Sequence, residues 1–351
     1  MTNIEPTKMA SELQSTDAML KNYVVIRDLS QGEEPSKWTK SQLAVDTRTN
    51  DKVLISRLDK MKFEVQYGFI PQSGSDTDEI RVEFKKNAES KYQDELKDFI
   101  RRHTRVVGLD HPNIAKVIDV GIDHNGEAVV TTEYVDGAPI FDVTCGMSIL
   151  GMIPIFLSIL EALDFIHDEN LLHLNLKSKR VFVKAAYPSV TKLTDYGYAV
   201  DIGEVAIKSY GSPIYSAPEV ILQESGKISE TSDLYSFAAL AYSCMCRADP
   251  FPDREEVSDI GKLKEIVTKE HEQMKPSQRN TLMLQKDCDK EAAAKIDKLE
   301  DIIVALLKAN PENRSLKSAR VVSKKITELF QDELNKKKLG DTTVTKSMSN
   351  R

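Results

Sequence analysis

The sequence predicts an α+β protein in which a small β-rich lobe with one main helix precedes a larger helical lobe. Three short apolar or alternating runs lie in the first third of the chain, and turn residues separate them, which is typical of antiparallel strands. They span residues 23–26, 42–45 and 52–58. Further along, apolar residues recur at helical spacing. These segments are 149–167, 232–246, 262–272, 295–309 and 317–330.

One helix and one hairpin complete the predicted small lobe. Residues 91–107 carry apolar side chains at spacings of three and four, which predicts an amphipathic helix that ends at Gly108. Strands at 115–120 and 128–134 follow, joined by an Asn125-Gly126 hairpin signal. We therefore expect a small lobe over residues 23–135, a large lobe over 136–330, and flexible segments at 1–22 and 331–351.

Composition and charge exclude several classes of protein. The 351 residues include 48 Lys and Arg against 55 Asp and Glu, a formal net charge of -7. A protein that binds along the phosphate backbone of a nucleic acid needs an excess of basic residues, so no nucleic acid partner is expected. The four cysteines lack the paired spacing of a zinc site and are too few for a disulfide framework. A reducing, cytoplasmic location is expected, and the polar N-terminus does not resemble a signal peptide.

Residues 143–160 form the longest apolar stretch of the chain. They contain no charged side chain over 18 positions, close to the lower limit for crossing a bilayer. Gly146, Gly151 and Pro154 interrupt the run, and Glu161 and Asp164 follow it at helical spacing. This pattern favours a helix that enters a soluble core, so no membrane span is expected.

Three motifs carry the functional prediction. Residues 173–177 read His-Leu-Asn-Leu-Lys, residues 195–197 read Asp-Tyr-Gly, and residues 216–219 read Ser-Ala-Pro-Glu. In this order and spacing they resemble the catalytic loop, the Asp-Phe-Gly element and the Ala-Pro-Glu element of protein kinases. The resemblance covers about residues 23–330, and within the family the sequence is most similar to bacterial Ser/Thr kinases. It implies a bilobal protein-kinase-like fold.

In the predicted small lobe, the resemblance implies that the phosphate-binding parts are changed. Ser56 stands where the family has the lysine that holds the α and β phosphates, and a hydroxyl cannot supply that cation. Arg102 stands where the family has the glutamate that pairs with this lysine, although Asp98 would take the position if the register were one helical turn earlier. The glycine-rich loop keeps only Gly32, next to two acidic residues.

In the catalytic loop, the resemblance implies that the proton acceptor and one metal ligand are lost. The base position is Asn175, whose neutral amide cannot accept a proton. Arg180 occupies the position of a metal-binding asparagine, and a guanidinium offers only donors. Asp195 is the one metal ligand that remains, so Mg²⁺ is not expected. Leu174 replaces the arginine that receives an activating phosphate in the family.

The resemblance also implies roles for the residues that are retained. His173, Glu219, Asp233 and Arg314 match structural positions, with His173 orienting the catalytic loop, Asp233 holding its backbone, and Glu219 pairing with Arg314. If ATP or ADP binds, the family positions that would contact it are Gly32, Thr132, Glu133, Val135, Lys177, Arg180 and Asp195. Such binding is expected to be weak, and no cofactor is required.

We therefore expect a pseudokinase, meaning a kinase-like domain without efficient phosphotransfer that acts as a signalling scaffold or allosteric binding module for a protein partner. One alternative is an atypical Ser/Thr kinase or nucleotidyl transferase with a rearranged ATP site. Another is a nucleotide sensor that changes shape without turnover. Nucleotide titration with and without Mg²⁺ would distinguish a sensor from a scaffold that does not respond to nucleotide.

Overall fold

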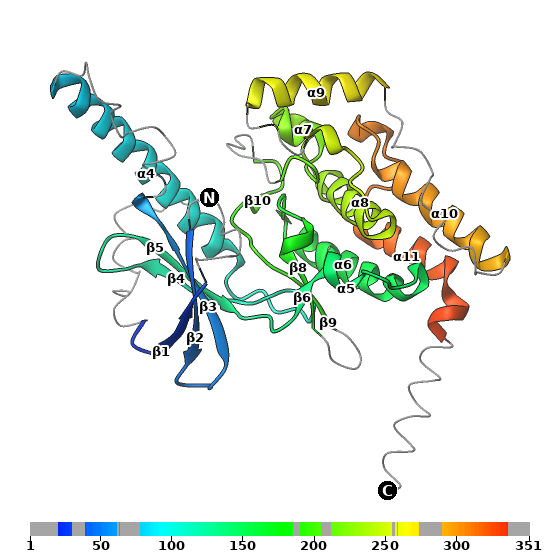
Figure 1. Cartoon of the computed structure of the whole chain (residues 1–351), viewed down its shortest axis with the longest axis horizontal. Coiled ribbons are helices and arrows are strands. Elements are labelled where there is room, and N and C mark those ends of the chain that lie inside the picture. The colour runs from blue at the N-terminus through cyan, green and yellow to red at the C-terminus, as the bar shows by residue number, and fades with distance from the viewer. Residues whose placement is uncertain are drawn as a thin grey trace, which may run out of the picture. The chain divides into compact units, whose positions relative to one another are not determined.

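The computed structural model describes residues 20–29, 39–61, 63, 78–184, 190–204, 212–254, 257, 259–273 and 290–335. The chain divides into two compact units (Figure 1). The small unit contains the residues up to Asp110 together with Ala115–Tyr134, and the large unit contains His111–Ile114 and the chain from Val135 onward. The short segment His111–Ile114 belongs to the large unit because the carbonyl of Asn113 accepts the backbone N–H of Leu193 at 2.8 Å, with Ile114 bridged to the same residue.

The small unit is built on a five-stranded antiparallel sheet with the order β1-β2-β3-β5-β4. Its strands are β1 (Tyr23–Asp28), β2 (Thr39–Asp46), β3 (Lys52–Leu58), β4 (Val117–Ile122) and β5 (Ala128–Glu133). Asp123 fixes the β4–β5 turn, because its Oδ1 accepts hydrogen bonds from the backbone N–H groups of Asn125 and Glu127. All five predicted strands are present.

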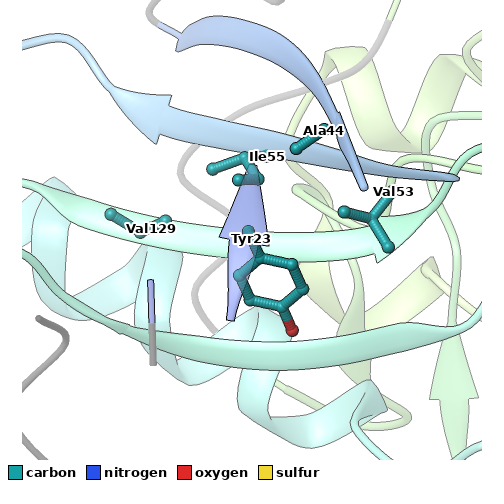
Figure 2. Packing of buried hydrophobic residues seen from close by; sticks show 5 residues of the cluster. All are labelled: Tyr23, Ala44, Val53, Ile55 and Val129. Carbon is teal, nitrogen blue, oxygen red and sulfur yellow. The ribbon is translucent and has the colours of Figure 1, made fainter. Parts of the chain in front are cut away.

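Alternation along the strands separates two faces of this sheet. One face buries Tyr23, Ala44, Val53, Ile55 and Val129 in a single apolar cluster (Figure 2). Successive side chains of β3 point to opposite sides of the sheet, so Leu54 and Ser56 lie on the other face. This second face carries the position at which the resemblance places a phosphate-binding lysine.

The main helix of the small unit is α4 (Asp78–Val106), which begins 13 residues earlier than the predicted start at residue 91. Its described C-terminal half buries Tyr92, Leu96, Phe99 and Ile100. The earlier turns are rich in charge, so apolar periodicity does not reveal them. The helix ends where predicted, just before Gly108, whose φ of +85° a side chain would disfavour.

In the large unit, short strands precede and connect the helices. The strands β6 (Ala138–Pro139), β8 (Val181–Lys184) and β9 (Val190–Leu193) form one sheet, and β7 (Leu171–Leu172) pairs with β10 (Val200–Asp201). Gly137 precedes β6, and a Cβ there would lie 2.7 Å from the carbonyl oxygen of Val183. Glycine is therefore required where the chain passes the β8 backbone so closely.

The larger elements described in the large unit are helices. They are α5 (Ile140–Val143), α6 (Ile149–Asp168), α7 (Pro218–Ile221), α8 (Glu230–Cys246), α9 (Ile260–Gln273), α10 (Lys290–Leu306) and α11 (Ala319–Leu329). Residues 331–335 are also helical, so the predicted flexible segment begins with ordered chain, and its remainder lies outside the described residues. Residues 1–19 of the predicted N-terminal segment lie outside them as well.

The apolar helix α6 is part of the core. It is long and apolar enough to cross a bilayer, but 56% of its most apolar window is buried inside the protein. Arg320 of α11 lies 2.9 Å from Asp164 and 2.7 Å from Asp168 on its polar side. Helix α8 is buried on all sides from Thr231 to Cys244. The β-rich unit and the helical unit confirm the predicted α+β class.

Candidate functional site

The segment after α6 is held by a single carboxylate from α8. Asp233 is fully buried, and its two oxygens accept backbone hydrogen bonds from His173 and Leu174, each at 2.8 Å. His167 Nε2 lies 2.9 Å from the same Oδ2 that accepts from His173. Burial alone would raise the pKa of Asp233. The side-chain hydrogen bond and charge of His167, together with the charge and backbone hydrogen bond of His173, outweigh burial and lower this pKa overall. Asp233 thus remains an ionised anchor for this loop.

His173 acts as a neutral, packed side chain. Its Nδ1 accepts the backbone N–H of Asn175 at 3.2 Å, so the proton resides on Nε2, which lies 3.2 Å from the carbonyl of Thr194. The ring also contacts Tyr196 edge-on, with centroids 5.4 Å apart. Burial lowers the pKa of His173. The imidazole therefore connects residues 173–175 to residues 194–196.

Three residues with predicted site roles meet at one carboxylate oxygen. Asn175 Nδ2 donates to Asp195 Oδ2 at 3.0 Å, and Arg180 Nε lies 2.8 Å from the same atom. The guanidinium N–H is not aligned for a hydrogen bond, so the second contact is an ion pair defined by distance. Both charged side chains are mostly covered, with 22% of Arg180 and 18% of Asp195 exposed.

The pairing of β8 with β9 explains why these residues converge. Val181 is the register partner of Leu193, so the residues that flank this pair are brought together. Arg180 O accepts both the backbone N–H and the hydroxyl of Thr194, each at 3.0 Å. Arg180 is thereby held beside Asp195, although the two are well separated in the sequence.

Two residues at this site have a left-handed backbone conformation, with positive φ. Leu174 has a φ of +54° and Asp195 a φ of +65°. For a residue with a Cβ, this conformation costs about 1–2 kcal/mol, and aspartate tolerates it better than leucine. The two hydrogen bonds to Asp233 hold Leu174, and the Asn175 and Arg180 contacts hold Asp195. The surrounding contacts therefore stabilise a locally strained loop.

These contacts do not suit a Mg²⁺ site. Mg²⁺ prefers octahedral oxygen ligands and gives up water reluctantly. The carboxylate that these contacts share belongs to Asp195, and the cation of Arg180 already neutralises it at 2.8 Å. Asn175 also lacks a group that could accept a proton, so these residues fit neither metal binding nor general-base chemistry.

In the small unit, the position of the phosphate-binding lysine is neutral. Ser56 of β3 places its Oγ 3.0 Å from Oγ of Ser41 on β2. Arg57, the next residue, is on the opposite face of the strand. It contacts the side-chain oxygen of Gln42, and its Nε lies 3.6 Å from Asp123 Oδ2. Arg57 therefore lies on the face opposite the position at which the resemblance places a lysine.

The helix α4 carries a cation where the resemblance places a glutamate. Arg102 is buried, with Nη1 3.5 Å from Glu95 Oε1 and Nη2 3.7 Å from Asp98 Oδ2. Asp98, the alternative position one turn earlier, is therefore the counter-ion of Arg102. These contacts place the charge of Arg102 against carboxylates of its own helix, while Ser56 contacts the neighbouring strand.

The remaining nucleotide-binding candidates are spread over both units. Thr132 and Glu133 end β5 in the small unit, where Glu133 N donates to Lys116 O at 2.8 Å. Val135 begins the large unit, and its carbonyl accepts the N–H of Gly137. Lys177 precedes the 3₁₀ turn of residues 178–180. Gly32 lies outside the described residues.

A buried ion pair joins α7 to the C-terminal part of the large unit. Arg314 Nη1 lies 2.6 Å from Glu219 Oε1, and Nη2 lies 2.8 Å from Oε2. The side chains are 0% and 1% exposed. Ser232 donates to Glu219 at 2.7 Å, which adds a third donor to this carboxylate. This bidentate geometry is the strong form of a carboxylate–guanidinium contact.

Two residues support the loop before α7. Arg254 is 1% exposed, and its Nη1 donates to the carbonyls of Ser216 at 3.1 Å and Pro213 at 3.4 Å. Tyr215, which lies in a stretch that resembles the family, donates through Oη to Ser178 Oγ at 3.4 Å and links this loop to the turn that carries Arg180. Sequence reasoning missed Arg254, because a single arginine carries no sequence pattern that would have identified it.

Comparison with known proteins identifies a family. The family model described as "Protein kinase domain" matches residues 67–327. Among curated proteins, the chain is 31% identical over 162 residues to "Serine/threonine-protein kinase pkn2" of Myxococcus xanthus, covering 43% of this chain and 19% of the relative. It is 30% identical over 149 residues to "Probable serine/threonine-protein kinase zyg-1" of Caenorhabditis briggsae, covering 40% and 20%. The chain thus spans only a small part of the length of these relatives.

Proposed function

The chain belongs to the protein kinase domain family, and from this premise we propose that it is a pseudokinase that binds a protein partner without transferring phosphate. The observation that carries the proposal is the pairing of Asp195 with Arg180 and Asn175. A kinase uses this aspartate to hold Mg²⁺ on the nucleotide. Here the carboxylate is neutralised by a side chain of its own domain.

The charge distribution supports the same proposal. Phosphoryl transfer depends on positioning and on charges that neutralise the phosphates. Ser56 offers a hydroxyl that is engaged with Ser41, and Arg102 is engaged with two carboxylates of its own helix. A positioned base contributes about 10²- to 10⁴-fold, and Asn175 cannot supply it. Several independent parts of the reaction are therefore compromised together.

The proposed partner is a protein, and the proposed location is the cytoplasm. Cys145, Cys244 and Cys246 are free thiols, which suits a reducing compartment. Because the scaffold residues Asp233, Glu219 and Arg314 are buried and paired, the large unit offers a stable surface for recognition. Within this proposal, ATP or ADP is a weak ligand and is not required.

Phosphotransfer provides the direct test. The purified chain is incubated with γ-labelled ATP, generic protein substrates, and Mg²⁺ or Mn²⁺, beside an Asp195→Ala variant. We expect label incorporation in both proteins to remain at the level of a heat-inactivated sample. Incorporation by the unmodified chain that Asp195→Ala abolishes would overturn the proposal. Incorporation that is equal in both would indicate a contaminating kinase.

An atypical Ser/Thr kinase is the second candidate, and the names of the two relatives favour it. Under this candidate, a bound nucleotide would draw Arg180 away from Asp195 and free the carboxylate. Activity would then rise in an Arg180→Asn variant, because an oxygen ligand would replace the guanidinium. A pseudokinase gains nothing from this change, because Ser56 and Asn175 remain in place.

A further inference from the structure

The segment from Asp195 to Asp201 has several anchors within the large unit. Tyr196 is 2% exposed, and its hydroxyl donates to Leu193 O at 3.1 Å. Gly197 N donates to Asp195 Oδ1 at 3.3 Å, and Ala199 N donates to Tyr196 O at 3.0 Å. The strand β10 then pairs with β7, with Asp201 opposite Leu171. The segment is thus hydrogen-bonded to the large unit near both ends and folded by two hydrogen bonds of its own in between.

The Arg180 and Tyr196 side chains each add a contact to this segment. Arg180 supplies a fixed cation to Asp195, where a kinase would rely on a metal ion that arrives with nucleotide. The hydroxyl of Tyr196 adds a hydrogen bond that a phenylalanine could not make. Neither contact requires a ligand, so both act in the protein alone.

We propose that Arg180 and Tyr196 are positioning residues that hold residues 195–201 in one conformation, with or without nucleotide. The inference deepens the proposed pseudokinase function and rests on it. A ligand can shift a conformational equilibrium only by its differential affinity for the two states. With Asp195 already paired with Arg180, the Mg²⁺ that accompanies a nucleotide gains little by contacting this carboxylate. The large unit would then present the same surface to a partner whether or not nucleotide is bound.

The covered ion pair favours the observed conformation of this segment. Arg180 and Asp195 are each about four-fifths covered, with exposed fractions of 22% and 18%. Removing the guanidinium would leave a mostly covered carboxylate without its cation, although the amide of Asn175 would still donate to it. The left-handed backbone of Asp195 would also be less well held. Both effects favour opening of the segment.

Hydrogen–deuterium exchange of the full chain tests the proposal. The peptides of interest cover residues 194–202, where the N–H groups of Thr194, Gly197 and Ala199 are hydrogen-bonded. The proteins compared are the unmodified chain, Arg180→Ala, Arg180→Lys and Tyr196→Phe. Lys184→Ala serves as the matched control, because it removes an exposed cation from β8 without touching Asp195. Each protein is measured alone, with ATP, and with ATP and Mg²⁺.

We expect exchange in the unmodified chain to be the same under all three conditions. Arg180→Ala should raise it about tenfold, the change expected when one charge-assisted contact is lost. Arg180→Lys should restore part of the protection, Tyr196→Phe should raise exchange less than Arg180→Ala, and Lys184→Ala should leave it unchanged. If Arg180→Ala proves too unstable to measure, the Tyr196→Phe and Arg180→Lys results decide.

Two outcomes would overturn the inference. One is protection of residues 194–202 by nucleotide in the unmodified chain, and the other is unchanged exchange in both Arg180→Ala and Tyr196→Phe. These outcomes are independent of the phosphotransfer assay. A nucleotide-responsive segment without label incorporation would refute the fixed conformation and leave the pseudokinase proposal standing. Label incorporation that depends on Asp195 would refute the pseudokinase proposal whatever the exchange result.

Discussion

Replacing Arg314 by methionine should strongly destabilise the large unit. The guanidinium is 0% exposed and makes a bidentate ion pair with Glu219, at 2.6 and 2.8 Å. Three backbone carbonyls also accept from it, those of Lys308, Thr231 and Ala309. Methionine fills most of the volume, so the variant tests the charge and its hydrogen bonds rather than a cavity.

The magnitude follows from what the substitution leaves behind. Glu219 would keep the Ser232 hydroxyl as a donor but lose its cation while remaining 1% exposed. Removing one member of a buried ion pair costs about 3–5 kcal/mol. In a domain of this size, each kcal/mol lowers the melting temperature by about 2–4 °C, so the expected decrease is roughly 6–20 °C. Removing the carboxylate instead should cost less, because Arg314 would keep its three carbonyl acceptors.

Thermal and urea unfolding of four proteins provides the assay: the unmodified chain, Arg314→Met, Glu219→Gln and the double variant. We expect the double variant to be more stable than the sum of the single effects predicts, with a coupling of about 1 kcal/mol or more. Arg320→Ala is the matched control. It removes an arginine that contacts two carboxylates, those of Asp164 and Asp168, but is 66% exposed, so its effect should be about 0–1 kcal/mol.

A melting temperature for Arg314→Met within about 2 °C of the unmodified chain would refute the reasoning, because that is the shift expected from less than about 1 kcal/mol. An effect as small as that of Arg320→Ala would show that the pair is solvated in solution. Additive single effects would show that the two side chains do not interact. Each result is read from the same unfolding curves.

The remaining predictions concern metal and pH. Nucleotide affinity measured by calorimetry should be at least as high in EDTA as in millimolar Mg²⁺, because Arg180 already supplies a positive charge at Asp195. The Arg180→Asn variant should bind nucleotide more tightly with Mg²⁺ than in EDTA. Tighter binding with Mg²⁺ by the unmodified chain would contradict this prediction. The large unit should also lose stability as the pH falls below about 6.5, the usual pKa of histidine. Burial lowers the pKa of His173, and the pKa of Asp233 is lowered too, so the unfolded state binds more protons in acid. Melting temperatures from pH 7.5 to 4 check this, and a flat profile would contradict it.

The sequence predicted the architecture well because periodicity and turn residues report directly on local structure. The strands of the small unit and helices α6, α8, α9, α10 and α11 all lie where apolar spacing placed them. The first three turns of α4 were missed because their charged side chains carry no apolar period. Propensity alone would have favoured a helix there, but a charge-rich segment is equally typical of solvated chain.

The partners of the site residues were harder to predict, because they depend on strand register. The sequence identified Arg180 and Asp195 as candidates and left Arg180 facing a nucleotide phosphate. The structure places them in contact with each other, since β8 pairs with β9 so that Val181 lies opposite Leu193. A shift of one residue in that register would turn Arg180 away. Spacing along the chain contains no information on this choice.

Three of the residues that match the kinase pattern, Asp233, Glu219 and Arg314, are fully buried, and losing any of them would destabilise the fold. Asp195 also matches the pattern but is less buried. Asp233, Glu219 and Arg314 are 1% exposed or less, whereas Asp195 is 18% exposed. In an enzyme, an unliganded metal-binding carboxylate is usually a source of instability, and replacing it tends to stabilise the protein. Here Asp195 lies 2.8 Å from Arg180, and a role as the counter-ion of that arginine would give its retention a structural reason.

The two roles that Asp195 could have, counter-ion or unused metal ligand, have opposite consequences for stability. As a counter-ion, its replacement by asparagine should lower stability by about 1–2 kcal/mol, because a mostly covered guanidinium loses its charge partner. Asparagine tolerates the left-handed backbone of this position, so the variant changes charge without adding strain. As an unused metal ligand, the same replacement should be neutral or stabilising. Urea unfolding of Asp195→Asn, with Asp253→Asn at an exposed position of the large unit as the control, decides between them. A stabilised Asp195→Asn would contradict the counter-ion role.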